Sequence, residues 1–301
     1  MRRLTPPAAL ARFALLPTLL LSATLAAQSP STGGWQGAAA TADMHAQGVR
    51  LRLATTDDGV LAIADNPLAG PVEVLLLASG STAPRSVPAL PARATVPARG
   101  SVVVARLLAG AGIDTSRATL RLQAVPGVPG ARPRDVEYRF PLRDAPVRVT
   151  QGFGGGVSHA DDENRHAVDF AVDEGTPVLA ARDGTVMQAE ARVAGTTRLG
   201  SGQHADAAER ANFIRILHDD GTMALYAHLQ RGGVVVAPGD RVRRGAVIGF
   251  SGNTGASSGP HLHFVLQANH GLRLVSVPFR MFGPGGILRF DLPPAADASS
   301  P

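Results

Sequence analysis

Apolar and polar residues alternate with a period of two early in the chain, where arginines separate Val49, Leu51 and Leu53. This alternation predicts a β-strand, and the Asp57-Asp58-Gly59 sequence that follows predicts a hairpin turn. Further strand-like runs are separated by Gly, Pro, Asp and Ser; they cover residues 60–63, 72–77, 101–107, 119–124 and 136–140. Several short strands at such intervals predict a small antiparallel β-sandwich, which we expect over residues 48–145.

The second half of the chain carries most of the residues capable of acid-base and metal chemistry. Residues 141–149 resemble a join between domains, and short apolar strands with Gly-rich turns continue after it. Eight of the nine histidines lie from His159 to His270. We therefore expect the catalytic domain over residues 146–290, followed by a disordered tail at residues 291–301.

The first 26 residues have the pattern of a secretory signal peptide. Arg2 and Arg3 precede an apolar run at residues 13–21, and small residues follow up to a cleavage site near Ala26. The alternative is a retained membrane anchor, but the run is short for a spanning helix and Pro17 interrupts it. We expect a periplasmic or secreted mature protein without stable membrane insertion, beginning with a flexible segment at residues 27–47.

Composition narrows the possible chemistry. The 301 residues include no cysteine, which excludes disulfides, thiolate zinc sites, iron-sulfur clusters and a cysteine nucleophile. All 29 basic residues are arginine, and without the first 26 residues the balance is 26 arginines against 24 acids. With 4% aromatic residues and no basic block, a nucleic-acid partner is not expected. Any metal must be bound mainly by His, Asp or Glu.

Three separate segments offer such ligands. His261 and His263 lie two apart in a strand-like run, so both imidazoles point to the same face. His166 and Asp169 lie in a second segment, and His228 lies in a third. Catalytic zinc typically takes three protein ligands from such residues and keeps one position open for water. Together the segments supply a candidate zinc site without cysteine.

These residues resemble the lysostaphin-type zinc peptidases, also called the LytM or peptidoglycan metalloendopeptidase family. The resemblance covers residues 147–279 and rests on motifs that occur in the family's order: AVDFAV, GTPV, DGTV, YAHL, PGDRVRRGAVIG and SSGPHLHF. It implies an antiparallel β domain whose active groove is floored by a sheet. It also implies an exported endopeptidase that uses one Zn²⁺ per chain to hydrolyse peptide bonds in peptidoglycan, with peptidoglycan peptides as its partners.

The resemblance also implies a role for four of the residues. In the family, the Asp and the second His of the HxH pair bind zinc, and they correspond here to Asp169 and His263. The first His of that pair and the His of YAHL assist catalysis, and they correspond to His261 and His228. The oligomeric state and the bond that is cut are not predicted.

The remaining zinc ligand departs from the commoner family pattern. That pattern has a His four residues before the Asp, where this chain has Arg165, whose guanidinium stays protonated and cannot bind zinc. His159 is the favoured candidate, because the glycines at 154–156 allow the chain to fold back. His166 is the alternate, although a separation of three on a regular strand puts it on the face opposite Asp169.

Two other functions remain open at this stage. A catalytically inactive relative of the same fold would bind cell wall or activate another hydrolase, and such relatives are expected to lack a ligand or an assisting histidine. A polymer-binding protein would instead use residues 27–145 as its functional part. Binding by that segment alone would favour this last alternative.

Overall fold

The computed structural model describes residues 48–79, 84–108, 119–143, 147–197, 210–283 and 285–290. These residues form β-strands, turns and loops and contain no α-helix, so the prediction of a mainly β protein is confirmed. Within these ranges no helix qualifies as a membrane span. The predicted signal peptide, flexible segment and tail lie outside the described residues.

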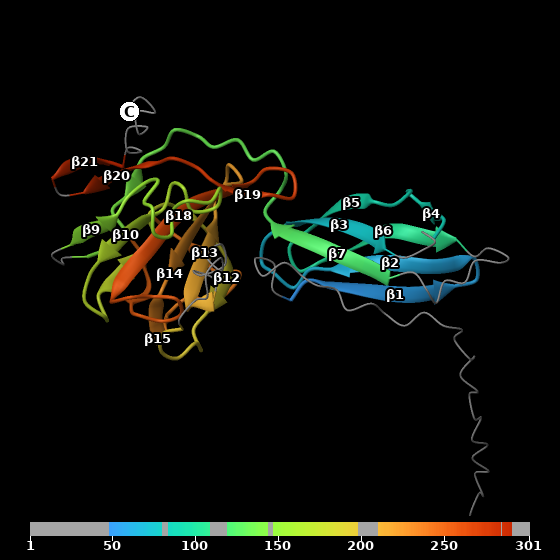
Figure 1. Cartoon of the computed structure of the whole chain (residues 1–301), viewed down its shortest axis with the longest axis horizontal. Helices are drawn as coiled ribbons and strands as arrows, with labels where there is room; N and C mark the ends of the chain where they lie inside the picture. The colour runs from blue at the N-terminus through green and yellow to red at the C-terminus, as the bar shows by residue number, and fades with distance from the viewer. Residues whose placement is uncertain are drawn as a thin grey trace, which may run out of the picture. The chain divides into compact units, whose positions relative to one another are not determined.

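The N-terminal region contains two antiparallel sheets (Figure 1). One has the strand order β1-β2-β6-β4, with bounds Arg50–Thr56, Gly59–Asp65, Ser101–Leu108 and Ser86–Val87. The other has the order β5-β3-β7, with bounds Ala92–Val96, Val72–Ser79 and Thr119–Pro126. Alternate side chains of both sheets are buried in one common core, as a sandwich requires. The predicted β1–β2 hairpin is present, with Thr56 paired to Gly59 across its two-residue turn.

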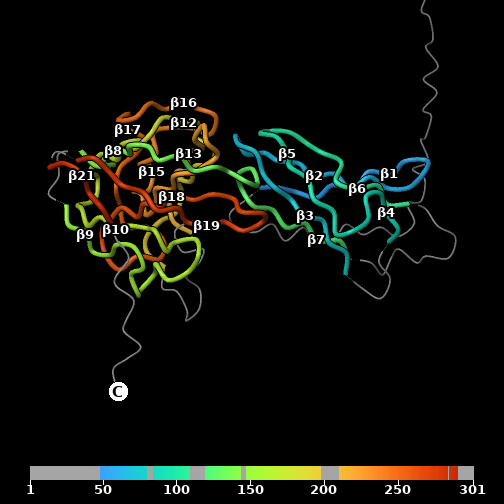
Figure 2. Tube along the Cα trace, turned by 90° about the horizontal axis from the view of Figure 1, so that it is seen from above, coloured from blue at the N-terminus to red at the C-terminus, as the bar shows by residue number. Residues whose placement is uncertain are grey.

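The C-terminal region is built on one large antiparallel sheet, seen in Figures 1 and 2. Its order is β16-β12-β13-β14-β18-β10-β9, and β19 pairs with β18. The bounds, in that order and ending with β19, are Arg241–Val242, Gly184–Glu190, Phe213–Leu217, Met223–Ala227, His261–Asn269, Val168–Ala171, Arg148–Gln151 and Leu274–Ser276.

Two small sheets complete this region. The first has the order β11-β17-β15, with bounds Pro177–Leu179, Val247–Ser251 and Leu229–Val234. The second has the order β21-β20-β8, with bounds Gly286–Arg289, Arg280–Gly283 and Tyr138–Arg139, and its β20–β8 pair is parallel.

The two faces of strand β18 have different environments. Leu262, Phe264 and Leu266 point into a large apolar core that also contains side chains of the small sheets. His261 and His263, at the odd positions, therefore point to the opposite face. The two histidines thus lie on one side of the sheet, beside a small apolar cluster that contains Leu225 and Val265, and the large apolar core lies on the other side.

The sandwich core extends into the C-terminal region. Met187, Met223 and Leu274 belong to the same buried cluster as the sandwich side chains. The Leu272 amide also donates a hydrogen bond of 2.7 Å to the buried carboxylate of Glu73. The exact boundary that we place near residues 141–149 stays a prediction, but residues on both sides of it share one core.

Candidate metal centre

Three of the predicted ligands lie together on the histidine-bearing face of the large sheet. One ligand atom from each of His159, Asp169 and His263 lies within 4.8 Å of the other two. Nε2 of His159 is 3.3 Å from Oδ1 of Asp169, and Nδ1 of His263 is 2.9 Å from the same oxygen. All three residues are buried.

Strand register brings two of these residues together. β10 and β18 are antiparallel, and Asp169 is paired directly with His263. Side chains of directly paired residues lie on the same face with their Cβ atoms about 5 Å apart. The pairing of the two strands therefore suffices to bring the Asp169 carboxylate next to the His263 imidazole.

His159 reaches the same place from the loop that follows β9. Gly154 takes a left-handed φ of 65°, and its amide donates a hydrogen bond of 2.7 Å to the carbonyl of Arg165. The loop thereby folds back on itself, and Nδ1 of His159 donates to the carbonyl of Gly152 at 2.9 Å. Glycine suits this turn because it adopts positive φ at no steric cost.

This hydrogen bond decides which His159 nitrogen faces the carboxylate. A carbonyl oxygen only accepts, so the Nδ1 proton is committed to Gly152 and neutral His159 presents a lone pair at Nε2. That atom is buried and has no hydrogen-bond partner among the residues that the structure describes. The lone pair of Nε2 and the Asp169 oxygen repel each other unless a cation lies between them.

The donor set fits a metal ion such as zinc. Bonds of about 2.0–2.2 Å in a tetrahedral site put the ligand atoms about 3.3 Å apart, close to the 3.3 Å and 2.9 Å found here. Burial acts to raise the pKa of Asp169, but the hydrogen bond between Nδ1 of His263 and Oδ1 of Asp169 outweighs it and holds that pKa well below its usual range. Burial lowers the pKa of His263. Both groups are thus held in the deprotonated form that metal ligands need.

The alternate ligand His166 lies elsewhere. Its Nδ1 is 3.1 Å from Oγ of Ser276, and its ring packs edge-on against Phe153 at a centroid distance of 5.2 Å. Burial lowers the pKa of His166. Of the two candidates left open by the sequence, the structure places His159 beside Asp169 and His263.

His228 and His261 lie beside this cluster with their rings 4.5 Å apart. Nδ1 of His228 donates to the carbonyl of Thr254 at 2.8 Å, and Nδ1 of His261 donates to the carbonyl of Gly259 at 2.8 Å. Each neutral ring therefore keeps a lone pair at Nε2. Nε2 of His261 is 3.9 Å from Oδ1 of Asp169, so it faces the space next to the cluster.

The backbone of His228 is held in an uncommon conformation. Its φ is 62°, in the left-handed region that costs a non-glycine residue about 1 kcal/mol or more. Oγ1 of Thr254 fixes the segment by donating to the Leu229 carbonyl and accepting from the Asn212 amide. Burial, reinforced by the neighbouring histidines, lowers the pKa of His228 to about 3, so this imidazole is neutral near pH 7.

Sequence reasoning missed Gln151. Its Nε2 donates to Oδ2 of Asp169 at 3.1 Å and to Oγ of Ser158 at 2.6 Å. Its Oε1 accepts hydrogen bonds from the amides of Val157 and Ser158. Gln151 therefore connects the Asp169 carboxylate to the loop that carries His159. The pairing of Gln151 with Asp169 across β9 and β10 reveals this role, and that register is not readable from the sequence.

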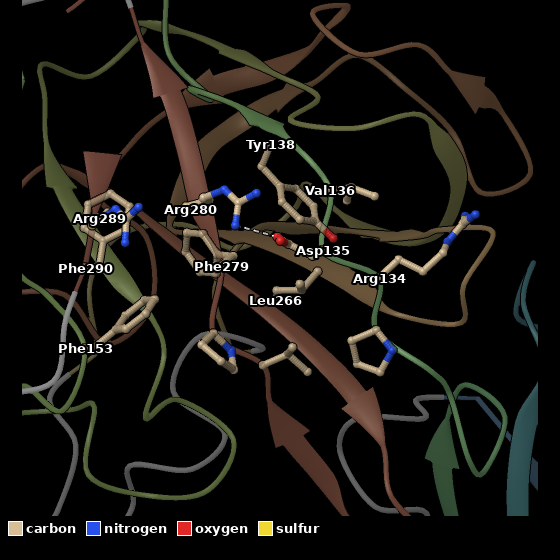
Figure 3. A pocket seen from close by; sticks show the side chains of 13 residues that line it. Arg134, Asp135, Val136, Tyr138, Phe153, Leu266, Phe279, Arg280, Arg289 and Phe290 are labelled. Carbon is tan, nitrogen blue, oxygen red and sulfur yellow. Dashed lines mark ion pairs between the residues drawn. The ribbon is translucent and has the colours of Figure 1, made fainter. Parts of the chain in front are cut away.

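A separate hollow lies on the other face of β18 (Figure 3). Its volume is about 390 Å³, and Leu266, Phe279 and Phe290 contribute to an apolar lining. Arg280 pairs with Asp135 at 2.6 Å on its wall. It shares no residue with the metal cluster, and Leu266 belongs to the apolar core, so we do not connect it with the histidine chemistry.

Comparison with known proteins gives an independent view of the same region. Residues 163–273 match the profile of peptidase family M23. The chain is 38% identical to glycyl-glycine endopeptidase ALE-1 of Staphylococcus capitis over 119 residues, which are 39% of this chain and 28% of that protein. It is 34% identical to peptidoglycan DD-endopeptidase ShyA of Vibrio cholerae over 131 residues, 42% of this chain and 26% of that protein.

Among solved structures, the catalytic domain of lysostaphin from Staphylococcus simulans is 32% identical, with 44% of this chain and 81% of that chain covered and a TM-score of 0.28. The sequence matches confirm the resemblance to lysostaphin-type peptidases for the C-terminal region. The match to this chain spans only about a quarter of the length of the two relatives described.

Proposed function

Because residues 163–273 match the profile of peptidase family M23, we propose that this protein is a zinc-dependent endopeptidase that hydrolyses peptide bonds in peptidoglycan. One observation carries the proposal. His159, Asp169 and His263 converge with a buried, unpartnered Nε2 on His159, and two further imidazoles stand beside them. The names of the relatives, a glycyl-glycine endopeptidase and a peptidoglycan DD-endopeptidase, support the same substrate class.

In this proposal His159, Asp169 and His263 bind one Zn²⁺. Such an ion polarises a scissile carbonyl and lowers the pKa of a bound water. The protein's own contribution is a fixed set of neutral imidazoles and one carboxylate. Gln151 orients that carboxylate, and the Gly152 carbonyl fixes the tautomer of His159.

His228 and His261 supply the proton chemistry. Each ring has its Nδ1 proton bound to a backbone carbonyl, so each Nε2 is free to accept a proton or to hydrogen-bond a developing oxyanion when protonated. His261 is the more accessible residue, because it is half-buried whereas His228 is buried. We propose both residues as catalytic.

We also propose export to the periplasm or the medium. The support is the signal-like sequence of residues 1–26 and the location of peptidoglycan outside the cytoplasmic membrane. Amino-terminal sequencing of the mature protein tests this point, with a first residue near Ala27 expected.

Zinc content and peptide cleavage together test the proposed function. Elemental analysis is made on wild type, His159→Ala and His166→Ala, and each protein digests purified peptidoglycan whose fragments are identified by mass spectrometry. We expect one zinc per chain and new peptide termini for wild type and His166→Ala, and neither for His159→Ala. Melting curves of all three proteins separate metal loss from unfolding.

The same experiment distinguishes the inactive alternative. A folded wild-type protein without zinc and without cleavage would favour a cell-wall-binding or hydrolase-activating role. Zinc bound to His159→Ala but lost from His166→Ala would replace the proposed ligand by the alternate one.

A further inference from the structure

A second hollow lies beside His261 at the margin of the histidine-bearing face. Its volume is about 430 Å³, and its lining consists of Val147, Arg148, Ala171, Val172, Asp173, Thr176 and Pro260. Arg148 and Asp173 are the charged residues of this lining. Neither belongs to the proposed zinc ligands or the assisting histidines.

Strand register puts Arg148 on the same face as the metal cluster. Ala171 of β10 is paired with His261 on one side and with Arg148 of β9 on the other. Directly paired residues of an antiparallel sheet point to the same face. The register of β9 and β10 shifts between Asp169 and Phe170, and the Ala171–Arg148 pair lies on the far side of this shift from the Gln151–Asp169 pair.

The strand register also gives the distance between the backbones of Arg148 and His261. Adjacent strands lie about 4.8 Å apart, so the backbones of Arg148 and His261 are separated by about 10 Å across β10. An extended peptide rises about 3.4 Å per residue. A group held at Arg148 is therefore about three residues away from a peptide bond at the histidines.

Within the histidine cluster, the side chains nearest to Arg148 are the more exposed ones. His261 and Asp169 retain 15% and 12% of their side-chain surface, whereas His159 retains none and His263 6%. Arg148 itself is exposed, and no hydrogen bond or ion pair to its guanidinium is found among the described residues. Its charge is therefore available to a bound molecule.

We propose that Arg148 is a specificity-determining residue that binds a free carboxylate of the peptide substrate, about three residues from the cleaved bond. A guanidinium binds a carboxylate through two parallel hydrogen bonds, which fixes orientation as well as charge. Asp173 lines the same hollow, and its negative charge partly opposes the binding of a carboxylate to Arg148. This proposal rests on the proposed endopeptidase function and adds the chemical group that the substrate presents.

The test uses synthetic stem peptides in which one free carboxylate at a time is converted into a carboxamide. For one position, we expect wild type to show a kcat/KM at least tenfold higher for the carboxylate than for the carboxamide. Arg148→Gln should remove this preference by lowering the carboxylate rate and leaving the carboxamide rate unchanged. Arg148→Lys should keep part of the preference, because it retains the charge but not the paired geometry.

Two matched variants control the experiment. Asp173→Asn should raise kcat/KM for the carboxylate peptide about two- to threefold, because a repulsive charge is removed. Arg121→Gln removes an exposed arginine from β7 and should change neither rate. An equal carboxylate preference in wild type and Arg148→Gln, or no preference at any position, would overturn the proposal.

A binding measurement keeps this result separate from the proposed function. The same peptide pairs are titrated by calorimetry into His261→Ala, with and without Arg148→Gln. At least tenfold weaker binding of the carboxylate peptide to the double variant supports the role of Arg148 even if wild type cleaves no peptide. Cleavage by wild type with equal binding to both variants would retain the endopeptidase and reject Arg148.

Discussion

Two clusters of charged and polar side chains lie in the C-terminal region. In one of them the charged groups are paired with each other, and in the other two buried nitrogen atoms have no hydrogen-bond partner among the described residues. In the first, Arg182 pairs with Asp220 at 2.7 Å and donates to the Tyr138 hydroxyl at 3.1 Å. Oδ1 of Asp220 also accepts bonds from the amide and the hydroxyl of Thr222. In the second, Nε2 of His159 and Nε2 of His263 are buried and have no hydrogen-bond partner within the described part of the chain.

The difference separates a structural cluster from a binding site. Burial acts to raise the pKa of both Asp220 and Asp169, and in both cases neighbouring groups outweigh it and hold the pKa low. A perturbed pKa alone therefore does not distinguish them. The distinction is that the Asp220 cluster finds its partners within the protein, whereas the Asp169 cluster leaves two buried imidazole nitrogens without a partner among the described residues.

Removing the metal is expected to have the largest effect. Asp169→Ala deletes the central ligand, so we expect no bound zinc and a fall in cleavage rate of at least 10³-fold. A chelator should lower the melting temperature of wild type, because zinc binds only the folded state. The same chelator should leave the melting temperature of Asp169→Ala unchanged. A chelator-induced shift in the variant would show that the metal site lies elsewhere.

Breaking the structural cluster should instead affect folding. Asp220→Ala leaves the buried Arg182 with one partner fewer, and we expect the free energy of unfolding to fall by about 3 kcal/mol. Urea denaturation measures this loss, and elemental analysis of the folded fraction should still find one zinc per chain. Loss of zinc at unchanged stability would mean that the two clusters are coupled.

Sequence reasoning recovered the parts of this picture that depend on local pattern. Period-two alternation identified the strands, and the spacing of His261 and His263 correctly put both imidazoles on one face. The glycines before His159 correctly indicated a loop that folds back. Contacts between distant segments were not accessible in this way. The bond from Gln151 to Asp169 depends on a register that shifts between Asp169 and Phe170, and no sequence period encodes such a shift.

His218 shows whether a single imidazole nitrogen without a hydrogen-bond partner is enough to make a metal site. Its Nε2 is buried without a partner, its Nδ1 donates to the Asp183 carbonyl at 2.8 Å, and burial lowers its pKa to about 4. In the unfolded chain His218 has its ordinary pKa near 6.5, so between pH 6.5 and 4 the unfolded state binds more protons than the folded state. Stability should therefore be full above this window and fall by about 3 kcal/mol as pH drops through it.

Urea denaturation at several pH values measures this effect. His218→Gln removes the titrating group, so its stability should depend less on pH across the same window. The zinc content of His218→Gln should equal that of wild type, because no second ligand converges on this nitrogen. A variant with an unchanged pH slope would assign the acid sensitivity to other groups.

Replacing Gln151 is expected to have the smallest effect on zinc binding. The Gln151 side-chain amide donates a hydrogen bond to Asp169 and so supplies one partner to the His159, Asp169 and His263 cluster. It holds Oδ2 of Asp169 and the loop before His159 at the same time. Partners that orient a metal ligand in this way typically contribute 10- to 100-fold to metal affinity. Gln151→Ala should therefore weaken zinc binding by about that factor, measured by competition with a chelator. The free energy of unfolding of the metal-free protein should fall by about 1–2 kcal/mol, because the hydrogen bonds of the Gln151 side chain are lost. Val149→Ala, an exposed change on the same strand, should leave both quantities unchanged. Equal zinc affinity in Gln151→Ala and wild type would mean that register alone positions Asp169, and the comparison would then rest on His159 and His263.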